Sequence, residues 1–211
     1  IYEKHMEFVF FSADTNQNKE NKEKAREYVM QLLNSAENEC LICDPYFKKE
    51  DFEKYIFFME KLDVKVRIIN SEKQLGNISA PDSEDYLLKL NDCINYYNRK
   101  VGREVAECRS LTKNLSIHDR FIIIDDCGWL IGSSLNEFGN RASSICKIPQ
   151  GSLEYMRKNF ERWWNDTENS ESLDGYIQRK VKLNASPEGK LLKHITHLTR
   201  VLNSLKSQLA K

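Results

Sequence analysis

His118 and Arg120 stand two positions apart, at the polar entrance of the apolar run at residues 121–124, which reads as a buried strand. Side chains at that spacing on a strand point to the same side. A histidine can supply a nitrogen nucleophile or a proton, and an arginine supplies a fixed positive charge. Asp125 ends the same strand. The segment therefore predicts chemistry on a negatively charged substrate, with these three residues as the candidate catalytic set.

Hydroxyl and amide groups follow within the same window. After a short turn, the apolar run at residues 129–131 leads into Ser133, Ser134 and Asn136. A hairpin at this turn returns these three residues to the start of the strand that carries His118. Donors that join a cation around one point suit the non-bridging oxygens of a phosphate, so we expect them to bind substrate.

Structural explanations compete with these chemical ones. A histidine beside an arginine before a buried strand is usually structural; here the acid at Asp125 and the Gly132-Ser133 pair in one window favour chemistry. No set of His, Cys, Asp and Glu stands at metal-ligand spacing, so we expect neither a metal nor another cofactor. Cys40 and Cys43 have the spacing of a zinc or redox pair, but a strand points them to opposite faces, which predicts reduced core cysteines.

The elements expected around this segment are short buried strands and amphipathic helices. The strands cover residues 7–12, 40–47, 64–69, 105–111, 121–126, 129–133 and 144–148, and the helices cover residues 21–33, 51–62, 86–100 and 153–164. Strand and helix alternate early in the chain and strands cluster later. This order predicts an α/β fold with a central mixed β-sheet flanked by helices.

The composition changes toward the end of the chain. We expect residues 1–166 to form the domain and the polar residues 167–189 to form a linker. Residues 190–211 read as a C-terminal helix whose apolar residues recur at spacings of four and three, a heptad pattern. These apolar residues are Leu191, Ile195, Leu198, Leu202, Leu205 and Leu209. Packing on the chain's own domain and self-association are both consistent with the pattern.

Composition restricts the partners. Thirty-two basic residues balance thirty-two acidic ones, so a nucleic-acid binder with this sequence must concentrate its positive charge locally. Five basic residues form either such a patch or a solvated helix face: Arg141, Lys147, Arg157, Lys158 and Arg162. No apolar run is long enough to span a membrane, and reduced cysteines fit a cytoplasmic protein. The first residue is not methionine, so we expect a piece of a longer protein, with further domains as an option.

The segment at residues 116–141 resembles the H-x-K-x4-D motif and the following G-S-x-N element of the phospholipase D superfamily. The upstream CDPYF, followed by a helix and then VKVRII, resembles the first half of such a domain. The resemblance covers about residues 7–164. It implies a phospholipase D-like fold and phosphodiester chemistry that needs no metal.

Three features depart from the family pattern. Arg120 stands where the family usually has lysine, which keeps the charge but changes its shape. Asn136 comes one place late, so that Leu135 takes the usual position of the asparagine. Many members orient the histidine with an acid beyond this element, and Glu137 is the nearest candidate here.

The family mechanism uses two histidines, one that attacks phosphorus and one that protonates the leaving oxygen. His5, His194 and His197 lack the cation and the acid at the required spacing, so the sequence holds one motif. The resemblance therefore implies a homodimer in which each chain lends His118 to a shared site. It implies a nuclease first. The alternatives are a catalytically weak or inactive module for nucleic-acid binding or dimerisation, and a lipid phosphodiesterase.

Overall fold

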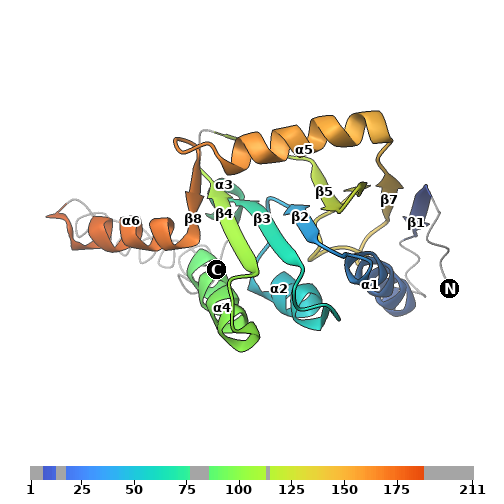
Figure 1. The fold of residues 1–211 in the computed structure, drawn as a ribbon, viewed down its shortest axis with the longest axis horizontal. Helices are drawn as coiled ribbons and strands as arrows, with labels where there is room; N and C mark the ends of the chain where they lie inside the picture. The colour runs from blue at the N-terminus through green and yellow to red at the C-terminus, as the bar shows by residue number, and fades with distance from the viewer. Residues whose placement is uncertain (1–6, 13–17, 77–85, 113–114, 188–211) are drawn as a thin grey trace, which may run out of the picture. The chain divides into compact units, whose positions relative to one another are not determined.

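The computed structural model of the chain describes residues 7–12, 18–76, 86–112 and 115–187. Residues 1–173 and residues 174–211 form two compact units. The first unit is built on one eight-stranded mixed sheet with the strand order β1-β7-β6-β5-β2-β3-β4-β8 (Figure 1). The strands are β1 (Phe8–Phe11), β2 (Glu39–Cys43), β3 (Lys65–Ser71), β4 (Ala106–Leu111), β5 (Arg120–Ile124), β6 (Cys127–Ile131), β7 (Ser143–Lys147) and β8 (Ser170–Ser172). The expected α/β fold with a central mixed sheet is confirmed.

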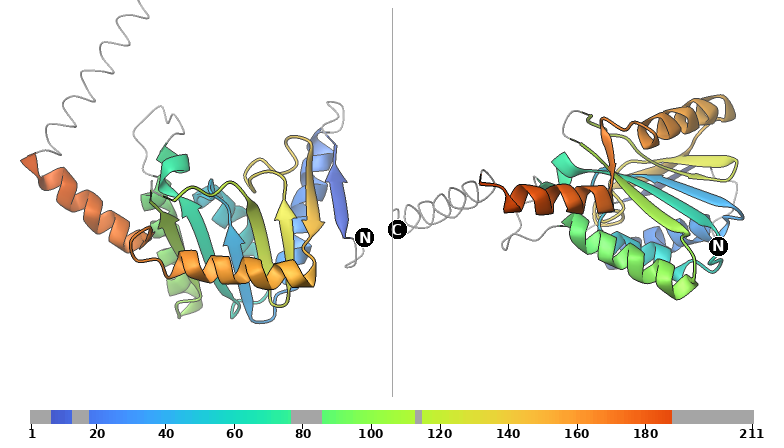
Figure 2. Two further views of the ribbon diagram at one scale, coloured as in Figure 1. Left: turned by 90° about the horizontal axis from the view of Figure 1, so that it is seen from above. Right: turned by 60° about the vertical axis from the view of Figure 1, so that its left-hand side comes forward.

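Helices cover both faces of this sheet. The helix α5 (Gln150–Trp164) lies on one face, and α1 (Asn18–Asn34), α2 (Lys49–Tyr55) and α4 (Tyr86–Val101) lie on the other (Figures 1 and 2). A 3-10 turn, η1 (Ile56–Phe58), continues α2, and the short helix α3 (Glu72–Gly76) follows β3. The expected helices of the domain are therefore found, with α2 shorter than its apolar period suggested.

The central strands β2 and β5 are apolar along nearly their whole length because helices cover both of their faces. Residues 121–124 are all buried, because helices cover both faces of a strand at the centre of the sheet. Phe121 and Ile123 face α5, where they pack in one cluster with Phe160 and Trp164. Burial of such side chains contributes about 1.5–3 kcal/mol each, so this cluster fixes where β5 lies.

Strand directions bring the start of β5, the end of β2 and the end of β6 to the same edge of the sheet. β2 runs parallel to β3, and β5 runs antiparallel to β2 with Cys43 opposite Phe121. The residues that follow β2 therefore lie beside the residues that precede β5. β6 is antiparallel to β5, with Ile131 opposite Arg120, so the residues that follow β6 reach the same edge. The predicted hairpin geometry of this segment is confirmed.

The expectation of a polar linker over residues 167–189 does not match the structure. Residues 170–172 form β8, which pairs antiparallel with β4, and residues 173–185 form the helix α6 (Leu173–Ala185). Ser170 is buried, and the side chain of Arg109 donates to both its hydroxyl and its carbonyl oxygen. An edge strand of three polar residues gives no apolar alternation, so its pairing was invisible in the sequence. The heptad residues 190–211 lie outside the described residues.

Two glycines with left-handed backbone allow a matched test of how tightly the β6–β7 loop, which contains Gly139, packs against α1. Gly139 (φ +81°) approaches α1 so closely that an added Cβ would lie 2.8 Å from Lys22 Cα, whereas Gly102 (φ +80°) has open space there. We expect Gly102→Ala to cost about 1 kcal/mol of unfolding free energy through backbone strain alone. Gly139→Ala should cost about 2–4 kcal/mol, because overpacking adds to the same strain. Urea denaturation of both variants measures the difference, and equal losses would contradict the tight contact.

Candidate active site

His118 and Arg120 lie at the polar entrance of β5. His118 is exposed, and Arg120 is half-buried. The Arg120 guanidinium is held in place by two contacts: Nη1 donates to the His118 carbonyl oxygen at 3.1 Å, and the group lies 5.4 Å from the centre of the Tyr46 ring. Tyr46 follows β2, so the cation is fixed between two strand ends at one edge of the sheet. The Nε–H of Arg120 is buried and has no hydrogen-bond partner among the described residues.

The turn after β6 lies at this edge, and its two serines make different contacts. The Ser143 hydroxyl donates to the Ser133 hydroxyl at 3.0 Å. Ser134 is buried, and its hydroxyl lies 2.7 Å from each carboxylate oxygen of Asp44. A hydroxyl has a single proton to donate. The expectation that Ser134 binds substrate is therefore not supported by this geometry, whereas Ser133 is half-buried and takes no part in the contact with Asp44.

Asp44 is the residue of this site that the sequence reading missed. In the sequence Asp44 stands out only as part of the CDPYF segment that resembles the first half of the family domain. In the structure the Asp44 carboxylate is buried and accepts hydrogen bonds from the Leu135 N–H at 2.8 Å and the Tyr46 N–H at 3.0 Å, besides the Ser134 hydroxyl. Burial raises the pKa of this carboxyl, and the hydrogen bonds and the Arg120 guanidinium oppose that rise. Asp44 thus joins the end of β2 to the turn after β6.

Asn136 and Glu137 complete the turn. Asn136 is half-buried, and its side-chain oxygen is buried without a hydrogen-bond partner among the described residues. Leu135, the preceding residue, is buried, and its hydrocarbon side chain offers no hydrogen bond. Glu137 is exposed and accepts from the Asn140 amide at 3.5 Å, and within the described part of the chain no hydrogen bond joins it to His118. The acid that would orient His118 is thus not identified by a contact.

Asp125 lies at the opposite end of β5, and the structure does not bring it to His118. Asp125 stands seven positions after His118, and an extended chain of that length spans roughly 20 Å. Asp125 has left-handed backbone (φ +45°), and its carboxylate accepts from the N–H groups of Glu37, Asn38 and Glu39 at 2.7–3.0 Å. Burial raises the pKa of this carboxyl, but the three backbone hydrogen bonds outweigh it and hold the pKa below its ordinary value. Asp125 therefore fastens the β5–β6 turn to the chain before β2.

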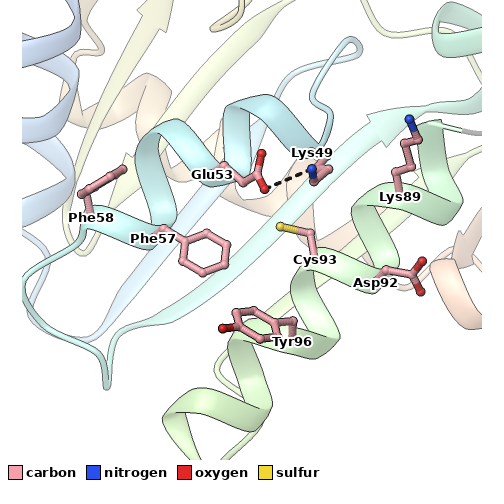
Figure 3. Close-up of a pocket in the computed structure, with 8 residues that line it drawn as sticks. All are labelled: Lys49, Glu53, Phe57, Phe58, Lys89, Asp92, Cys93 and Tyr96. Atoms are coloured by element: carbon pink, nitrogen blue, oxygen red, sulfur yellow. Dashed lines mark ion pairs between the residues drawn. The ribbon is translucent and has the colours of Figure 1, made fainter.

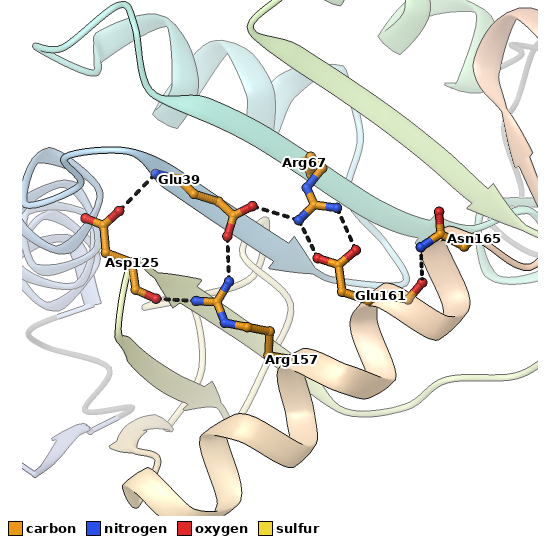
Figure 4. Close-up of polar contacts among 6 residues, drawn as sticks. All are labelled: Glu39, Arg67, Asp125, Arg157, Glu161 and Asn165. Carbon is orange, nitrogen blue, oxygen red and sulfur yellow. Dashed lines mark hydrogen bonds and ion pairs between the residues drawn. The ribbon is translucent and has the colours of Figure 1, made fainter.

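An ion-pair network continues this fastening toward α5 (Figure 4). Arg157 donates to the Asp125 carbonyl oxygen and to the Glu39 carboxylate, and Arg67 pairs with Glu39 at 2.7 Å and with Glu161 through both of its terminal nitrogens. The Arg67 guanidinium also lies over the Phe160 ring. The network ties α5 to β2, β3 and the β5–β6 turn.

The five basic residues that follow the motif do not gather into one patch at the site. Arg157 is used in the network, and Lys158 pairs with Glu154 one turn earlier on α5. Lys147 ends β7 at the side of the sheet away from His118, because β7 starts at the site edge. Arg141, in the loop before β7, is exposed on the site edge. Of the two interpretations, the solvated helix face describes α5 better than a patch.

Metal and membrane features can be stated for the described residues alone. There, no group of three or more His, Cys, Asp and Glu side chains could hold a metal ion. None of the described helices is long and apolar enough to cross a membrane. The six cysteines are free thiols, as expected, and Cys43 belongs to the core cluster on the α5 face.

Comparison with known proteins agrees with this fold. The family described as "Cardiolipin synthase, PLD-like domain" matches residues 29–164, more than half of the chain. Phosphatidylserine synthase from Haemophilus influenzae Rd KW20 superposes with a TM-score of 0.53 at 18% identity, over 92% of this chain and 45% of that one. The phospholipase D family member Nuc from Salmonella typhimurium gives 0.50 at 18% identity, over 70% and 90%. NucT from Helicobacter pylori gives 0.49 at 15% identity, over 78% and 98%.

At these identities the structural likeness establishes the fold alone. The chain spans less than half of the phosphatidylserine synthase chain that it matches. No curated protein sequence matches the chain. Activity and substrate must therefore be argued from the residues at the site.

The position of Asp125 gives a prediction about stability and pH. Asp125→Ala should lower the free energy of unfolding at neutral pH by about 1–3 kcal/mol, because three backbone N–H groups lose their acceptor. The pKa of Asp125 is lowered in the folded chain, so this stabilisation is full above the ordinary pKa of aspartate, about 3.9, and is lost as the pH falls through the folded value. Urea denaturation of both proteins across this range measures it. The exposed neighbour supplies the control, since Asp126→Ala should change stability by less than about 0.5 kcal/mol; equal effects of the two variants would contradict the fastening role.

Proposed function

The chain belongs to the cardiolipin synthase, PLD-like domain family, and from this premise we propose that it is a metal-independent phosphodiesterase, a nuclease, with His118 as its nucleophile. The observation that carries the proposal is the meeting of His118, Arg120 and the turn at Ser133 and Asn136 at one edge of the sheet. Neighbouring strand ends then carry a candidate nucleophile, a fixed cation and two polar residues. That set matches the needs of phosphoryl transfer, in which positioning and charge stabilisation supply most of the rate.

The proposed reaction has two displacements. In the first, a neutral His118 nitrogen attacks phosphorus, the bond to the leaving oxygen breaks, and His118 of the partner subunit gives that oxygen a proton. In the second, the now neutral histidine takes a proton from water, whose oxygen attacks phosphorus and breaks the phosphorus–nitrogen bond. Arg120 neutralises the phosphate oxygens in both steps through its guanidinium charge. His5, His194 and His197 lack the cation and the acid of the motif, so in this proposal the second imidazole comes from another copy.

Nucleic acid is the proposed substrate because the site is open. His118 is exposed at the sheet edge, where a polymer with bulky groups on both sides of the phosphate can lie across it. Arg141 is exposed on the same edge and can contact a neighbouring phosphate. The family resemblance also favours nucleases for single-motif chains that act as pairs, which is an analogy rather than a physical argument.

A second candidate function is a module of the same fold that binds a phosphodiester without turnover. The observation that favours it is Leu135, which is buried in the family position of an asparagine and leaves Asn136 one place late. A leucine side chain gives the phosphate no hydrogen bond there. Binding would then persist while cleavage is absent.

Cleavage in the presence of a chelator separates the two candidates. We expect labelled oligonucleotides to be cut in excess EDTA, and His118→Ala to lower the rate on the order of 10³-fold or more with the fold intact by circular dichroism. Arg120→Lys should keep activity within about tenfold, whereas Arg120→Met, which removes the charge, should lose about 10²- to 10³-fold. Wild-type binding without cleavage would favour the second candidate. Cleavage that needs added Mg²⁺, or that survives His118→Ala, would overturn the proposed mechanism.

Mixed subunits test whether two copies of His118 share one site. Wild-type and His118→Ala chains are mixed in varying ratios under conditions that allow subunit exchange. Because one composite site needs both imidazoles, activity should follow the square of the wild-type fraction, about one quarter at equal amounts. Independent sites would give about one half, and that linear dependence would contradict the shared site. The exchange itself is checked with differently labelled chains.

A further inference from the structure

An exposed row of large apolar side chains lies on the sheet beside the site. Phe8 is 56% exposed and Phe10 is 60% exposed on the edge strand β1, and Leu130 is 41% exposed on β6. Two aromatic rings and a leucine leave on the order of 300 Å² of apolar side chain in water. Large apolar residues that gather in this way mark an interaction surface more often than scattered ones do.

The strand register places all three on one face. Phe8 and Leu130 both pair with Cys146 of β7, so these two lie in one row across the sheet, and Phe10 lies two residues further along β1. Their strand neighbours Val9 and Trp129 are buried on the opposite face. Since side chains alternate along a strand, Phe8, Phe10 and Leu130 share the other face. We call these three residues the β1–β6 patch.

This face is the one that carries α5, and α5 does not reach the patch. Leu130 lies opposite Phe121, whose ring packs against Phe160 and Trp163 of α5. β1 lies beyond the N-terminal end of the helix (Figure 1). The sheet therefore has a helix over its centre and bare apolar strands at its β1 edge.

The patch is continuous with the candidate active site. Phe10 is opposite Ser144 in the register, and the Ser144 carbonyl accepts from the Gly132 N–H at 2.9 Å. Ser133, the next residue, receives a hydrogen bond from Ser143. A molecule seated on the β1–β6 patch therefore lies next to the turn that faces His118.

We propose that the β1–β6 patch is the surface through which two copies of this chain pair, each patch being covered by the partner subunit. The inference rests on the proposed function, because a site that needs a second His118 is incomplete without a second copy. A two-fold pair uses the same surface on both chains, so the surface must adjoin the shared site, as this one does. The patch is less than half of the ~800 Å² that each partner of a stable interface buries, which suits it to be the apolar centre of a larger, more polar contact.

A second apolar surface serves as the contrast. A pocket between α2, η1 and α4 is lined by Phe57, Phe58, Cys93 and Tyr96, with the Lys49–Glu53 ion pair at its rim (Figure 3). It lies on the helical face opposite to α5, away from the β1–β6 patch. Phe58 is 60% exposed, which matches Phe10 in residue type and exposure.

The test compares charged substitutions on the two surfaces. We expect the wild-type protein to be a dimer by sedimentation equilibrium, and Phe10→Glu and Leu130→Glu to raise its dissociation constant about 100-fold or more, since buried aromatic anchors dominate interfaces. Phe58→Glu should leave the dimer unchanged. Circular dichroism checks the fold of each variant; a misfolded Phe10→Glu is replaced by the milder Phe10→Ser, which should weaken the dimer in the same direction.

The outcomes separate this inference from the proposed function. If Phe10→Glu and Leu130→Glu remain dimers as tight as the wild type, the pairing surface lies elsewhere and this inference is overturned, while a shared His118 site stands. If those variants instead lose only binding to vesicles of phosphatidylcholine and phosphatidylglycerol, the patch is a lipid-contacting surface and the inference is equally overturned. A wild-type monomer that cleaves oligonucleotides would overturn both. Monomeric variants that lose cleavage together with pairing support both.

Discussion

The buried carboxylate of Asp44 is the constraint on which the arrangement of the site depends. A charge in the interior of a protein costs several kcal/mol unless hydrogen bonds replace its water. Here those bonds come from the Ser134 hydroxyl and the Leu135 N–H, which belong to the turn after β6. If the turn moved away from the end of β2, the buried carboxylate would lose these hydrogen bonds. Ser133 and Asn136, on either side, are therefore held beside the entrance of β5.

A similar device operates at the other end of the same strand. The Asp125 carboxylate accepts hydrogen bonds from three backbone N–H groups at the start of β2 and just before it, and the Asp125 carbonyl oxygen accepts from Arg157 of α5. The six residues between His118 and Asp125 thus include a whole strand, β5, whose far end is fixed by these contacts. In the proposed function His118 is the reacting group, whereas the contacts of Asp125 fix the far end of the strand.

Much of this could be read from the sequence, because period and turn signals are local. The strands around residues 121–131 and the helix α5 follow from apolar runs and helical spacing. The hairpin brings Ile131 opposite Arg120, so the residues that follow β6 reach the start of β5, as expected. The task of Ser134 could not be read, since its partner Asp44 stands 90 positions earlier and only the sheet order brings them together. The strand β8 could not be predicted for the same reason, because its three polar residues form a strand only through pairing with β4.

The polar residues discussed above fall into two groups according to whether their buried atoms have hydrogen-bond partners. Asp44, Ser134 and Asp125 have protein partners for the atoms that matter, so they hold the structure together. The Arg120 Nε–H and the Asn136 side-chain oxygen are buried without such partners in the part of the chain that the structure describes. An unpaired buried polar atom costs about 1–3 kcal/mol, and functional sites are where folded proteins tolerate that cost. These two atoms belong to the strand ends that also carry His118, whereas the Nε of Arg67, likewise unpaired among the described residues, lies in the ion-pair network of α5. An unpaired atom therefore supports the proposed site only where it lies beside His118.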